Sequence, residues 1–362
     1  MNGQVRYVYY HQKYCHPGKK KLGDLHKHII GINHPPKGNV FFDCASCWHG
    51  KPKKGEISRK KWRQQQHTHH KTRDTFDVYS PEALHTDVIE EIFDYLDTVD
   101  PIPAGTIIQN AEQFHMDFGF ARGTQFHQKD EKMRLITSLD RYRAYLLIID
   151  RKSRYIWINL HKTKHPPVQF LKLFFDTHGR KAGRRVVRTD KGGDLWGSFE
   201  FRKTVTDAGY LLEPTAPEAP FQNGMAERPQ QTLGNMMRCM LHGANVGPEF
   251  WSFALLHAAR IYNMLPHSAT GQTPSYSFTG KRPSDANLRI WGCRIYAKKT
   301  GNRPHKLDYQ TSTGIYLGHT ATDKIIHYYD TDTKRIKTTT YAVFTRPTTP
   351  SRPLNDQQPL KT

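Results

Sequence analysis

The sequence is poor in cysteine, in long apolar runs and in acidic residues, and each shortage excludes a class of protein. Five cysteines, an odd and sparse set in 362 residues, do not form the framework of a disulfide-stabilised secreted protein. The longest apolar stretch covers residues 144–149, far too short to span a bilayer. The N-terminus has no basic segment followed by an apolar one, so we expect neither secretion nor a membrane partner.

The shortage of acidic residues leaves a large positive charge. Lys and Arg number 54 against 33 Asp and Glu, which gives a formal net charge of +21. This surplus favours a polyanionic partner over a merely soluble basic protein, and nucleic acid leads because phosphate contacts need basic side chains over an extended surface. Hydrophobic residues make up only 36%, which indicates modest domains joined by polar segments.

Composition divides the chain into five regions. Residues 1–50 are rich in His, Lys and Gly, whereas residues 51–110 hold a basic run at 51–73 and an acidic amphipathic helix beginning near Ser80. Residues 111–270 alternate strands and helices, which predicts a mixed sheet flanked by helices. Short β-rich segments at 285–346 predict a small antiparallel β-barrel, and the proline-rich residues 347–362 predict disorder.

Apolar periodicity locates the elements of this multidomain α/β chain. In the central region, strands are expected at 112–120, 142–149, 155–160, 184–189 and 210–214, the first of them central in its sheet. Helices are expected at 168–178, 198–208, 224–244 and 249–265. In the C-terminal region, strands are expected at 295–297, 313–317, 325–329, 335–339 and 341–344.

Two pairs of possible metal ligands stand in the N-terminal region: His11 with His16, and Cys44 with Cys47. Zinc takes four nitrogen or sulfur ligands in a tetrahedron, and ligand pairs close in sequence chelate it readily. A region this short builds little core, so a structural zinc ion would supply stability. A small apolar face between the pairs would come from Leu22, Leu25, Ile29 and Ile30.

The alternative to this zinc site is coincidence, because the chain has 21 histidines. Other residues of the region could replace one of the four ligands: Cys15, His26, His28, His34 and His49. The histidines at 67, 69 and 70 lie in the basic run, where solvated side chains are the simpler interpretation.

Three acidic residues in the central region have the setting of a phosphodiester-cleaving site. Asp117 stands inside an otherwise apolar strand, where a carboxylate is costly unless it is paired or bound to metal. Asp190 ends a strand before a glycine-rich loop, and ligands commonly bind outside the carboxyl ends of such strands. Glu227 lies near the start of an expected helix. Two-metal chemistry needs carboxylates that converge from distant parts of the chain.

Each acid also has an ordinary explanation. Asp190 and Glu227 could interact with helix termini, and Asp117 could be a surface residue of an edge strand. Asp150, at the end of the second strand, is the main rival for the first position, and Asp194 is a weaker rival to Asp190. We prefer Asp117 because its strand would be central in the sheet.

These motifs together resemble the integrase region of copia-type LTR retrotransposon polyproteins. The segments RTDKGGDLWGSFEF and APFQNGMAERPQQTL are similar to the second half of the integrase core. HQKYCHP with CASC resembles the zinc module that precedes that core, and RIWGCRIY, HKLDYQTSTGIYLGHT and YAVF resemble the β-barrel that follows it. The resemblance covers about residues 8–346, except for the acidic helix region.

The resemblance implies a ribonuclease-H-like core in which Asp117, Asp190 and Glu227 are catalytic and hold two Mg²⁺ or Mn²⁺ ions. It implies 3′-end processing and strand transfer of element DNA into target DNA, performed by a homo-multimer in the nucleus after synthesis in the cytoplasm. It also implies one structural Zn²⁺ ion at the His₂Cys₂ set. Candidate DNA contacts are Lys191, Gln222, Asn223, Arg228 and Arg238, although surface charge explains the basic members equally well.

Two observations favour a competing hypothesis, that of a catalytically inactive, nucleic-acid-binding remnant of a retroelement. No protease, reverse transcriptase or nucleocapsid signature accompanies the integrase-like motifs, and Pro229 stands two residues after Glu227. Proline removes a helix N–H and kinks a helix unless it falls in the first turn. A simple metal-dependent nuclease is disfavoured because it needs neither a zinc module nor a barrel.

Overall fold

A computed structural model describes residues 3–34, 44–51, 110–123, 134–163, 165–179, 183–190, 194–214, 224–299, 307–320 and 323–345. The expected acidic helix near Ser80, nearly all of the basic run and the expected disordered tail lie outside these residues.

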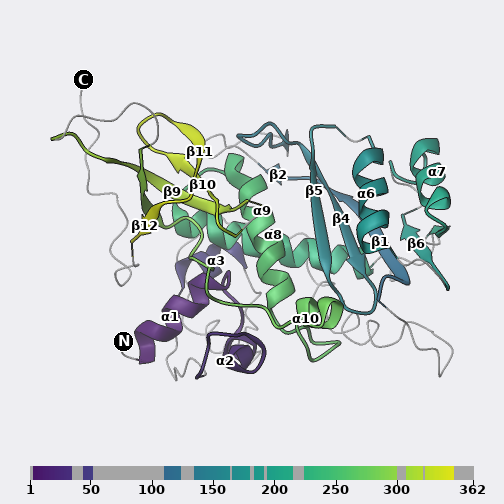
Figure 1. Ribbon diagram of the computed structural model, residues 1–362, viewed down its shortest axis with the longest axis horizontal. Helices are drawn as coiled ribbons and strands as arrows, with labels where there is room; N and C mark the ends of the chain where they lie inside the picture. Colours follow the sequence, from purple (N-terminus) through teal and green to yellow (C-terminus); the bar gives the residue numbers. More distant parts are fainter. Residues whose placement is uncertain are drawn as a thin grey trace, which may run out of the picture.

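The centre of the structure is a mixed five-stranded sheet (Figure 1). Its strands are β1 (Gln113–Gly119), β4 (Ala144–Asp150), β5 (Ile156–His161), β6 (Val186–Thr189) and β7 (Leu211–Pro214). The order is β5-β4-β1-β6-β7, in which β4 runs antiparallel to β1 and β5, whereas β6 runs parallel to β1 and β7. The predictions of a mixed sheet and of a central first strand are confirmed.

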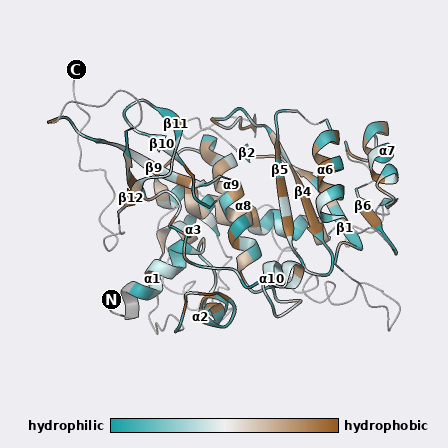
Figure 2. Ribbon diagram, in the orientation of Figure 1, coloured by the Kyte–Doolittle hydropathy of each residue, from teal (hydrophilic) through white to brown (hydrophobic). Residues whose placement is uncertain are grey.

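Helices cover both faces of this sheet. They are α6 (Val168–His178), α7 (Phe199–Asp207), α8 (Gly224–Ala244) and α9 (Trp251–Met264). Every residue of β4 is buried, and successive side chains enter different cores. Leu146 and Ile148 pack with α6 and α7, whereas Tyr145, Leu147 and Ile149 pack with α8 and α9. Figure 2 shows the resulting apolar strands in brown.

The same alternation decides where the polar residues of β1 lie. Phe114, Met116 and Phe118 are buried in the core shared with α6 and α7. Because successive side chains of a strand point to opposite faces, His115 and Asp117 lie on the face covered by α8 and α9. The carboxylate inside this apolar strand is therefore directed toward the helix that carries Glu227.

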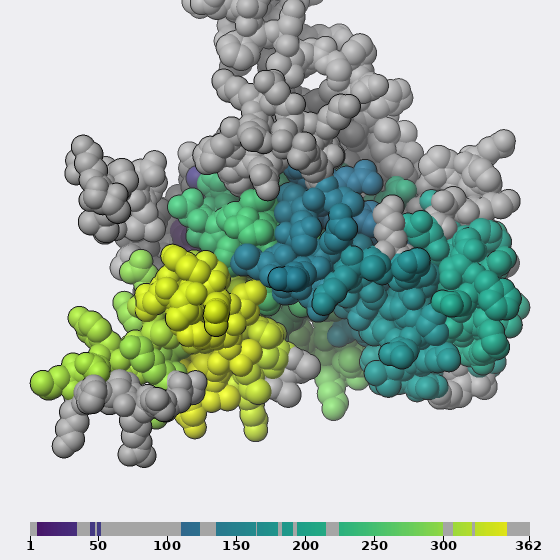
Figure 3. Space-filling model, turned by 90° about the horizontal axis from the view of Figure 1, so that it is seen from above, coloured from purple at the N-terminus to yellow at the C-terminus, as the bar shows by residue number. Residues whose placement is uncertain are grey.

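A separate antiparallel sheet forms the C-terminal part. It comprises β8 (Arg294–Lys298), β9 (Thr311–His319), β10 (Ile326–Asp330), β11 (Arg335–Thr339) and β12 (Ala342–Phe344), in the order β11-β10-β9-β8-β12. Within the described residues β11 does not pair with β12, so closure into the expected barrel stays a prediction. Figure 3 shows this sheet in yellow and the teal central region at opposite ends of one face.

Short elements connect these parts. A two-stranded ribbon pairs β2 (Arg122–Gly123) with β3 (Arg134–Leu135). The 3-10 helix η3 (Pro248–Phe250) leads into α9, and α10 (Pro274–Thr279) follows it. None of the helices in the described ranges is long and apolar enough to cross a membrane.

The N-terminal part consists of α1 (Gly3–Lys13), α2 (Lys19–His28) and α3 (Ala45–Gly50). Helix α3 packs on α8, and buried residues of α1 and α2 belong to the hydrophobic core that also includes α8 and α9. Leu22, Leu25 and Ile29 are buried as predicted. The expectation for Ile30 is wrong, because its residue surface is 57% exposed. Its backbone instead pairs with Ser284 in an isolated parallel bridge. Ile30 therefore links the N-terminal part to the segment before β8 and does not contribute to the core.

Candidate carboxylate and metal sites

Three acidic residues meet beside the central sheet from separate elements. The parallel register pairs Met116 of β1 with Thr189 of β6, so the next residues along the two strands are Asp117 and Asp190. Glu227 lies in the first turn of α8, which packs across β1. The charges of Asp190 and Glu227 both act on Asp117, so the structure brings the three predicted acids together.

Burial opposes the ionisation of Asp117, the strand residue of this cluster. Burial raises the pKa of Asp117 from 3.8 to about 6, and the charges of Asp190 and Glu227 add to that rise. Hydrogen bonds oppose it: the backbone of Phe118 contributes one, and Gln230 Nε2 donates another to Asp117 Oδ2 at 3.0 Å. A half-buried carboxylate that resists ionisation gains most when a cation neutralises it.

A buried tyrosine forms one wall of this cluster. Burial, and then the charge of Asp117, raise the pKa of Tyr145 above its ordinary value, so its phenol stays protonated. The ring of Tyr145 lies over Gly119, where an added Cβ would overlap it. Glycine at 119 therefore permits the close approach of an aromatic ring to the end of β1.

The three carboxylates do not enclose one ion between them. In the described part of the chain, one group of His, Cys, Asp or Glu residues has its ligand atoms close enough together to surround an ion. This group is His11, His16, Cys44 and Cys47. The charges of Asp190 and Glu227 act on Asp117 even though the three carboxylates do not form such a close set. Asp190 and Glu227 are exposed, so cations have access to the cluster.

The rival acids occupy different settings. Asp150 is fully buried, and its Oδ2 accepts hydrogen bonds from Ser153 N at 2.8 Å and Ser153 Oγ at 2.6 Å. Its Oδ1 accepts one from Ala111 N at 2.7 Å. These three bonds give Asp150 a structural role at the β4–β5 turn. Asp194 is exposed and does not figure among the charges that act on Asp117.

The second site brings together all four of the predicted N-terminal ligands. Their ligand atoms all lie within 4.8 Å of one another. His11 Nε2 lies 3.2 Å from Cys47 Sγ, and His16 Nδ1 lies 3.2 Å from Cys44 Sγ. Around a zinc ion with bonds of about 2.0–2.3 Å, neighbouring ligand atoms would be separated by roughly 3.3–3.8 Å, so the set fits the ion.

Local structure directs these ligands inward. His11 lies in the last turn of α1, and Cys44 precedes α3, which carries Cys47. His16 follows a turn in which Cys15 and His16 have φ values of 56° and 62°, a conformation that side chains other than glycine rarely adopt. Burial lowers the pKa of His16, which keeps its imidazole in the neutral form that binds metal.

The alternative N-terminal ligands are engaged elsewhere. Cys15 Sγ contacts Met240 Sδ at 3.2 Å, and His26 Nδ1 lies 2.8 Å from the carbonyl of Gly23. The ring of His49 stacks on that of His242 with 4.2 Å between centroids. The geometry thus favours the predicted four residues over replacements by Cys15, His26 or His49.

The candidate DNA contacts are unevenly placed. Lys191, Gln222 and Asn223 lie outside the described residues. Arg228 is half-buried next to Glu227 on α8. Arg238, three turns further along that helix, donates from Nε to the carbonyl of Gly50 at 3.0 Å, so its guanidinium holds α3 against α8.

Two further residues of α8 bear on the site, Gln230 and Pro229. Sequence reasoning did not single out Gln230, although its three-residue spacing from Glu227 places both on one face of the helix. Pro229 lies in the second turn of α8 and not in the first, so one helical hydrogen bond to the carbonyl of Met225 is missing. The helix continues through this position to Ala244.

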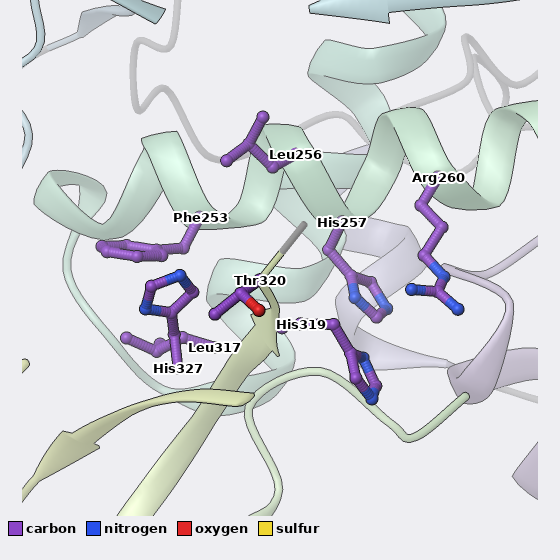
Figure 4. A pocket seen from close by; sticks show the side chains of 9 residues that line it. Phe253, Leu256, His257, Arg260, Leu317, His319, Thr320 and His327 are labelled. Atoms are coloured by element: carbon purple, nitrogen blue, oxygen red, sulfur yellow. The ribbon is translucent and has the colours of Figure 1, made fainter. Parts of the chain in front are cut away.

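A pocket of about 160 Å³ lies between α9 and the C-terminal sheet, and none of its lining residues belongs to either site (Figure 4). His257, His319 and His327 line it with Arg260, whose guanidinium contacts Asp323 at 2.6 Å. Burial lowers the pKa of His257 to about 3 and that of His319 to about 4. The histidines are therefore neutral near pH 7, and the pocket carries little net charge.

Comparisons with known proteins agree with a retroelement relationship. No family model matches the chain. It is 30% identical over 187 residues to a retrovirus-related Pol polyprotein from transposon TNT 1-94 of Nicotiana tabacum. It is 24% identical over 212 residues and 25% identical over 190 residues to such polyproteins from transposons RE2 and RE1 of Arabidopsis thaliana. These matches cover 51%, 58% and 52% of this chain but only 13–14% of each polyprotein.

One similar solved structure is a simian T-cell lymphotropic virus intasome in complex with PP2A regulatory subunit B56 gamma. The similarity covers 73% of this chain and 92% of that chain, with 15% identity and a TM-score of 0.33.

Proposed function

We propose that this chain is a retrotransposon-type integrase, a DNA-binding polynucleotidyl transferase that cleaves and joins phosphodiester bonds with divalent metal. The observation that carries the proposal is the convergence of Asp117, Asp190 and Glu227, which lie on β1, after β6 and on α8. The sequence similarity to plant transposon Pol polyproteins supports the same activity.

The proposed roles of the residues follow from their positions. Two Mg²⁺ or Mn²⁺ ions held by the three acids would supply Lewis-acid activation of the attacking oxygen and stabilise the leaving 3′-oxygen. Asp117 lies in a central strand, which fixes the position of its backbone. Gln230 orients the Asp117 carboxylate through the 3.0 Å hydrogen bond. Tyr145, which is buried and lies close enough to feel the charge of Asp117, would limit the access of water to that carboxylate.

The rest of the chain would serve DNA binding and assembly. We propose a structural Zn²⁺ ion at the His₂Cys₂ set within a module at 1–50, a linker at 51–110, a catalytic core at 111–270 and a DNA-binding barrel at 285–346. Lys191, Gln222, Asn223 and Arg228 are proposed to contact DNA near the acids. Joining two element ends to one target requires more than one copy, and element DNA is joined to host DNA in the nucleus.

A strand-transfer assay tests this proposal. Purified protein is mixed with Mn²⁺, a short duplex that carries a candidate element end, and a supercoiled plasmid. We expect a joined product that disappears with Asp190→Asn and Glu227→Gln together, while DNA binding persists. The matched control combines Glu200→Gln with Asp207→Asn on α7, which removes the same charges from exposed positions.

Each result decides between named possibilities. If the double variant at 190 and 227 still joins DNA, these acids do not form the active site. If folded wild-type protein binds DNA but joins none of several candidate ends, the chain is an inactive nucleic-acid-binding remnant.

A further inference from the structure

The pocket between α9 and the C-terminal sheet is the strongest feature that the proposed function does not use (Figure 4). Four residues of α9 line it, spaced along one helix face at three, four and seven residues after the first: Phe253, Leu256, His257 and Arg260. A helix face that packs on a sheet is ordinarily apolar, but half of this one is polar. Its polar side chains therefore need hydrogen-bond partners in the pocket or around it.

An irregularity in β9 shapes the opposite wall. This strand carries one extra residue, Leu317, between the positions that pair with His327 and Tyr328 of β10. Such a bulge changes the direction of neighbouring side chains. Gly318, which follows, has a φ of 125°, and a Cβ built on it would lie 3.9 Å from His257 Nδ1. The bulge and the glycine together leave space in front of the His257 ring.

Two ring nitrogens of residues that line this pocket are unpaired. His257 Nε2 and His327 Nδ1 are buried, and neither has a hydrogen-bond partner within the described part of the chain. The imidazole of His319 differs, because its Nδ1 lies 2.7 Å from the hydroxyl of Tyr316. Buried polar atoms are nearly always paired in folded proteins, since an unpaired one loses the hydrogen bonds that water gives it in the unfolded chain. A bound molecule with a polar edge would supply the missing bonds.

The charges around the pocket favour an uncharged occupant. Burial lowers the pKa values of His257, His319 and His327, so all three imidazoles are neutral near pH 7. The Arg260 guanidinium contacts the Asp323 carboxylate at 2.6 Å, and the two charges offset each other. A neutral imidazole offers one donor and one acceptor, which suits an occupant that carries both kinds of group.

The size of the pocket limits the occupant to about one ring. Its volume is about 160 Å³. An engineered apolar cavity of about 150 Å³ binds benzene, whereas drug-sized ligands occupy pockets of roughly 300–1,000 Å³. The rings of Phe253 and His327, with centroids 5.6 Å apart, give the pocket aromatic surface for a planar molecule. An uncharged planar ring with donors and acceptors on its edge has the chemistry of a pyrimidine base.

We propose that the pocket between α9 and β9 binds one unstacked pyrimidine base of a nucleic-acid strand, with His257 and His327 hydrogen-bonded to its edge. The inference rests on the proposed DNA-binding function and adds a place where the protein contacts a base and not a phosphate. Removing a base from its stack costs least where the strand is single or already unpaired. The pocket would therefore hold a strand at a point where the duplex is open.

Saturation-transfer NMR with uncharged nucleosides tests the pocket without metal or DNA joining. The intact chain is mixed with each of the four deoxynucleosides, and transfer to the base protons is recorded. We expect transfer to thymidine and deoxycytidine, and its loss in His257→Phe, which keeps a ring but removes both nitrogens. The matched control is His178→Phe, which makes the same replacement on α6, away from the lining of the pocket.

Thermal unfolding separates a ligand-binding histidine from a structural one. Because His257→Phe removes a buried nitrogen that has no partner among the described residues, we expect its Tm to equal or exceed that of wild type. A Tm well below wild type would show that the imidazole supports the fold and would overturn its role as a ligand group. Leu256→Trp, at a position 42% exposed, is a second variant that fills the pocket and should also abolish transfer.

Fluorescence anisotropy tests whether the base belongs to a strand. Labelled oligothymidylate is compared with an abasic strand of equal length, so that both carry the same phosphate charge. We expect wild type to bind the thymidine strand about tenfold more tightly, and both pocket variants to lose this difference. A difference that persists in both variants would place the base contacts elsewhere and overturn the inference. Nucleoside transfer without any difference between strands would limit the pocket to free nucleosides and overturn its assignment to a strand.

The inference and the proposed function fail in distinguishable ways. Wild-type protein that joins DNA but shows neither nucleoside transfer nor strand preference would overturn the inference alone. Protein that binds the base through His257 but joins no DNA end would support the pocket and count against the proposed joining activity.

Discussion

Ionisation of the Asp117 carboxyl group costs free energy in the folded chain, and its surroundings explain why. Burial is the largest cause, and two neighbouring carboxylates add to it, so the pKa of Asp117 in the folded chain is about 6 against 3.8 without those surroundings. The folded state therefore holds this proton more tightly than the unfolded state does. The protonated form stabilises the fold below about pH 4, and this contribution is lost as the pH rises through about 6.

We predict that Asp117→Asn stabilises the metal-free protein at pH 7.5 and changes its stability little at pH 4. Relief of even 1 kcal/mol would raise Tm by about 2–4 °C in a chain somewhat smaller than this one. Thermal unfolding in the presence of EDTA measures the shift at both values of pH. Adding Mn²⁺ at pH 7.5 should stabilise the wild type more than the variant, because the cation offsets the charge that asparagine lacks.

Asp207→Asn serves as the control for this prediction, since Asp207 is exposed and pairs with Lys203 on the surface of α7. If Asp117→Asn changed Tm by the same amount at both values of pH, the pKa explanation would be contradicted. Destabilisation by Asp117→Asn at pH 7.5 would contradict it too, because it would mean that the ionised carboxylate is favourable in the fold.

The contact between α3 and α8 depends on one glycine. A Cβ built on Gly50 would lie 2.5 Å from Cys239 Sγ and 2.8 Å from Cys239 N, closer than real Cβ contacts come. We predict that Gly50→Ala separates α3 from α8, exposes Cys239 to alkylating reagents and weakens zinc binding. Mass spectrometry of iodoacetamide-treated protein would detect the exposed thiol.

Gly234→Ala, on α8, is the matched control for this prediction. A Cβ added to Gly234 would meet only Arg238 Nη1, at an ordinary 3.6 Å, so the substitution should leave Cys239 protected. Protection of Cys239 in Gly50→Ala as complete as in the wild type would show that the helices do not depend on this close approach.

Local sequence signals specify some elements fully and others hardly at all. The structure places α6 at Val168–His178, α8 at Gly224–Ala244 and β11 at Arg335–Thr339, as their apolar spacing predicts. The apolar run of β4 predicts a strand, but it does not predict that every residue of the strand is buried, which results from helices on both faces of the sheet. In contrast, the sequence predicts no helix at α1 or α3, whose positions depend on tertiary contacts: α3 packs on α8, and Tyr10 of α1 joins the core shared with α8 and α9.

The candidate sites divide in the same way. Asp117 was noticeable because a carboxylate in an apolar strand is costly, and Gln230 could have been predicted from its spacing to Glu227 on one helix face. The contact of Cys239 with Gly50 could not, since no local pattern links residues that only the docking of α3 brings together. Long-range contacts of this kind are decided by tertiary packing.

At the scale of the whole molecule, α8 and α9 tie the parts together. They pack on the central sheet, on the N-terminal helices and, through α9, on β9 of the C-terminal sheet. The N-terminal part also reaches the segment before β8, where Lys13 Nζ contacts Asp285 at 2.6 Å and Tyr14 donates to the same carboxylate at 2.5 Å. If the chain binds DNA as proposed, DNA bound to one part would be held by a framework that includes the others.

The net charge of +21 predicts that DNA binding by this framework depends strongly on salt. Each phosphate that the protein neutralises releases condensed counterions, so the logarithm of affinity falls linearly with the logarithm of salt concentration. For about six to ten phosphate contacts, affinity should fall by about 10³- to 10⁵-fold between roughly 50 and 200 mM salt. Fluorescence anisotropy with a labelled duplex measures the slope.

The variant with Asp190→Asn and Glu227→Gln separates phosphate binding from chemistry in this measurement. Removing two exposed negative charges from the proposed active site should leave the salt slope unchanged and the affinity equal or slightly higher, because neither acid contacts phosphate without a cation. A shallow slope in the wild type would mean that few phosphates are neutralised and that the charge serves another purpose. A slope that falls only in the double variant would place these acids in the DNA-binding surface and argue against a role confined to metal.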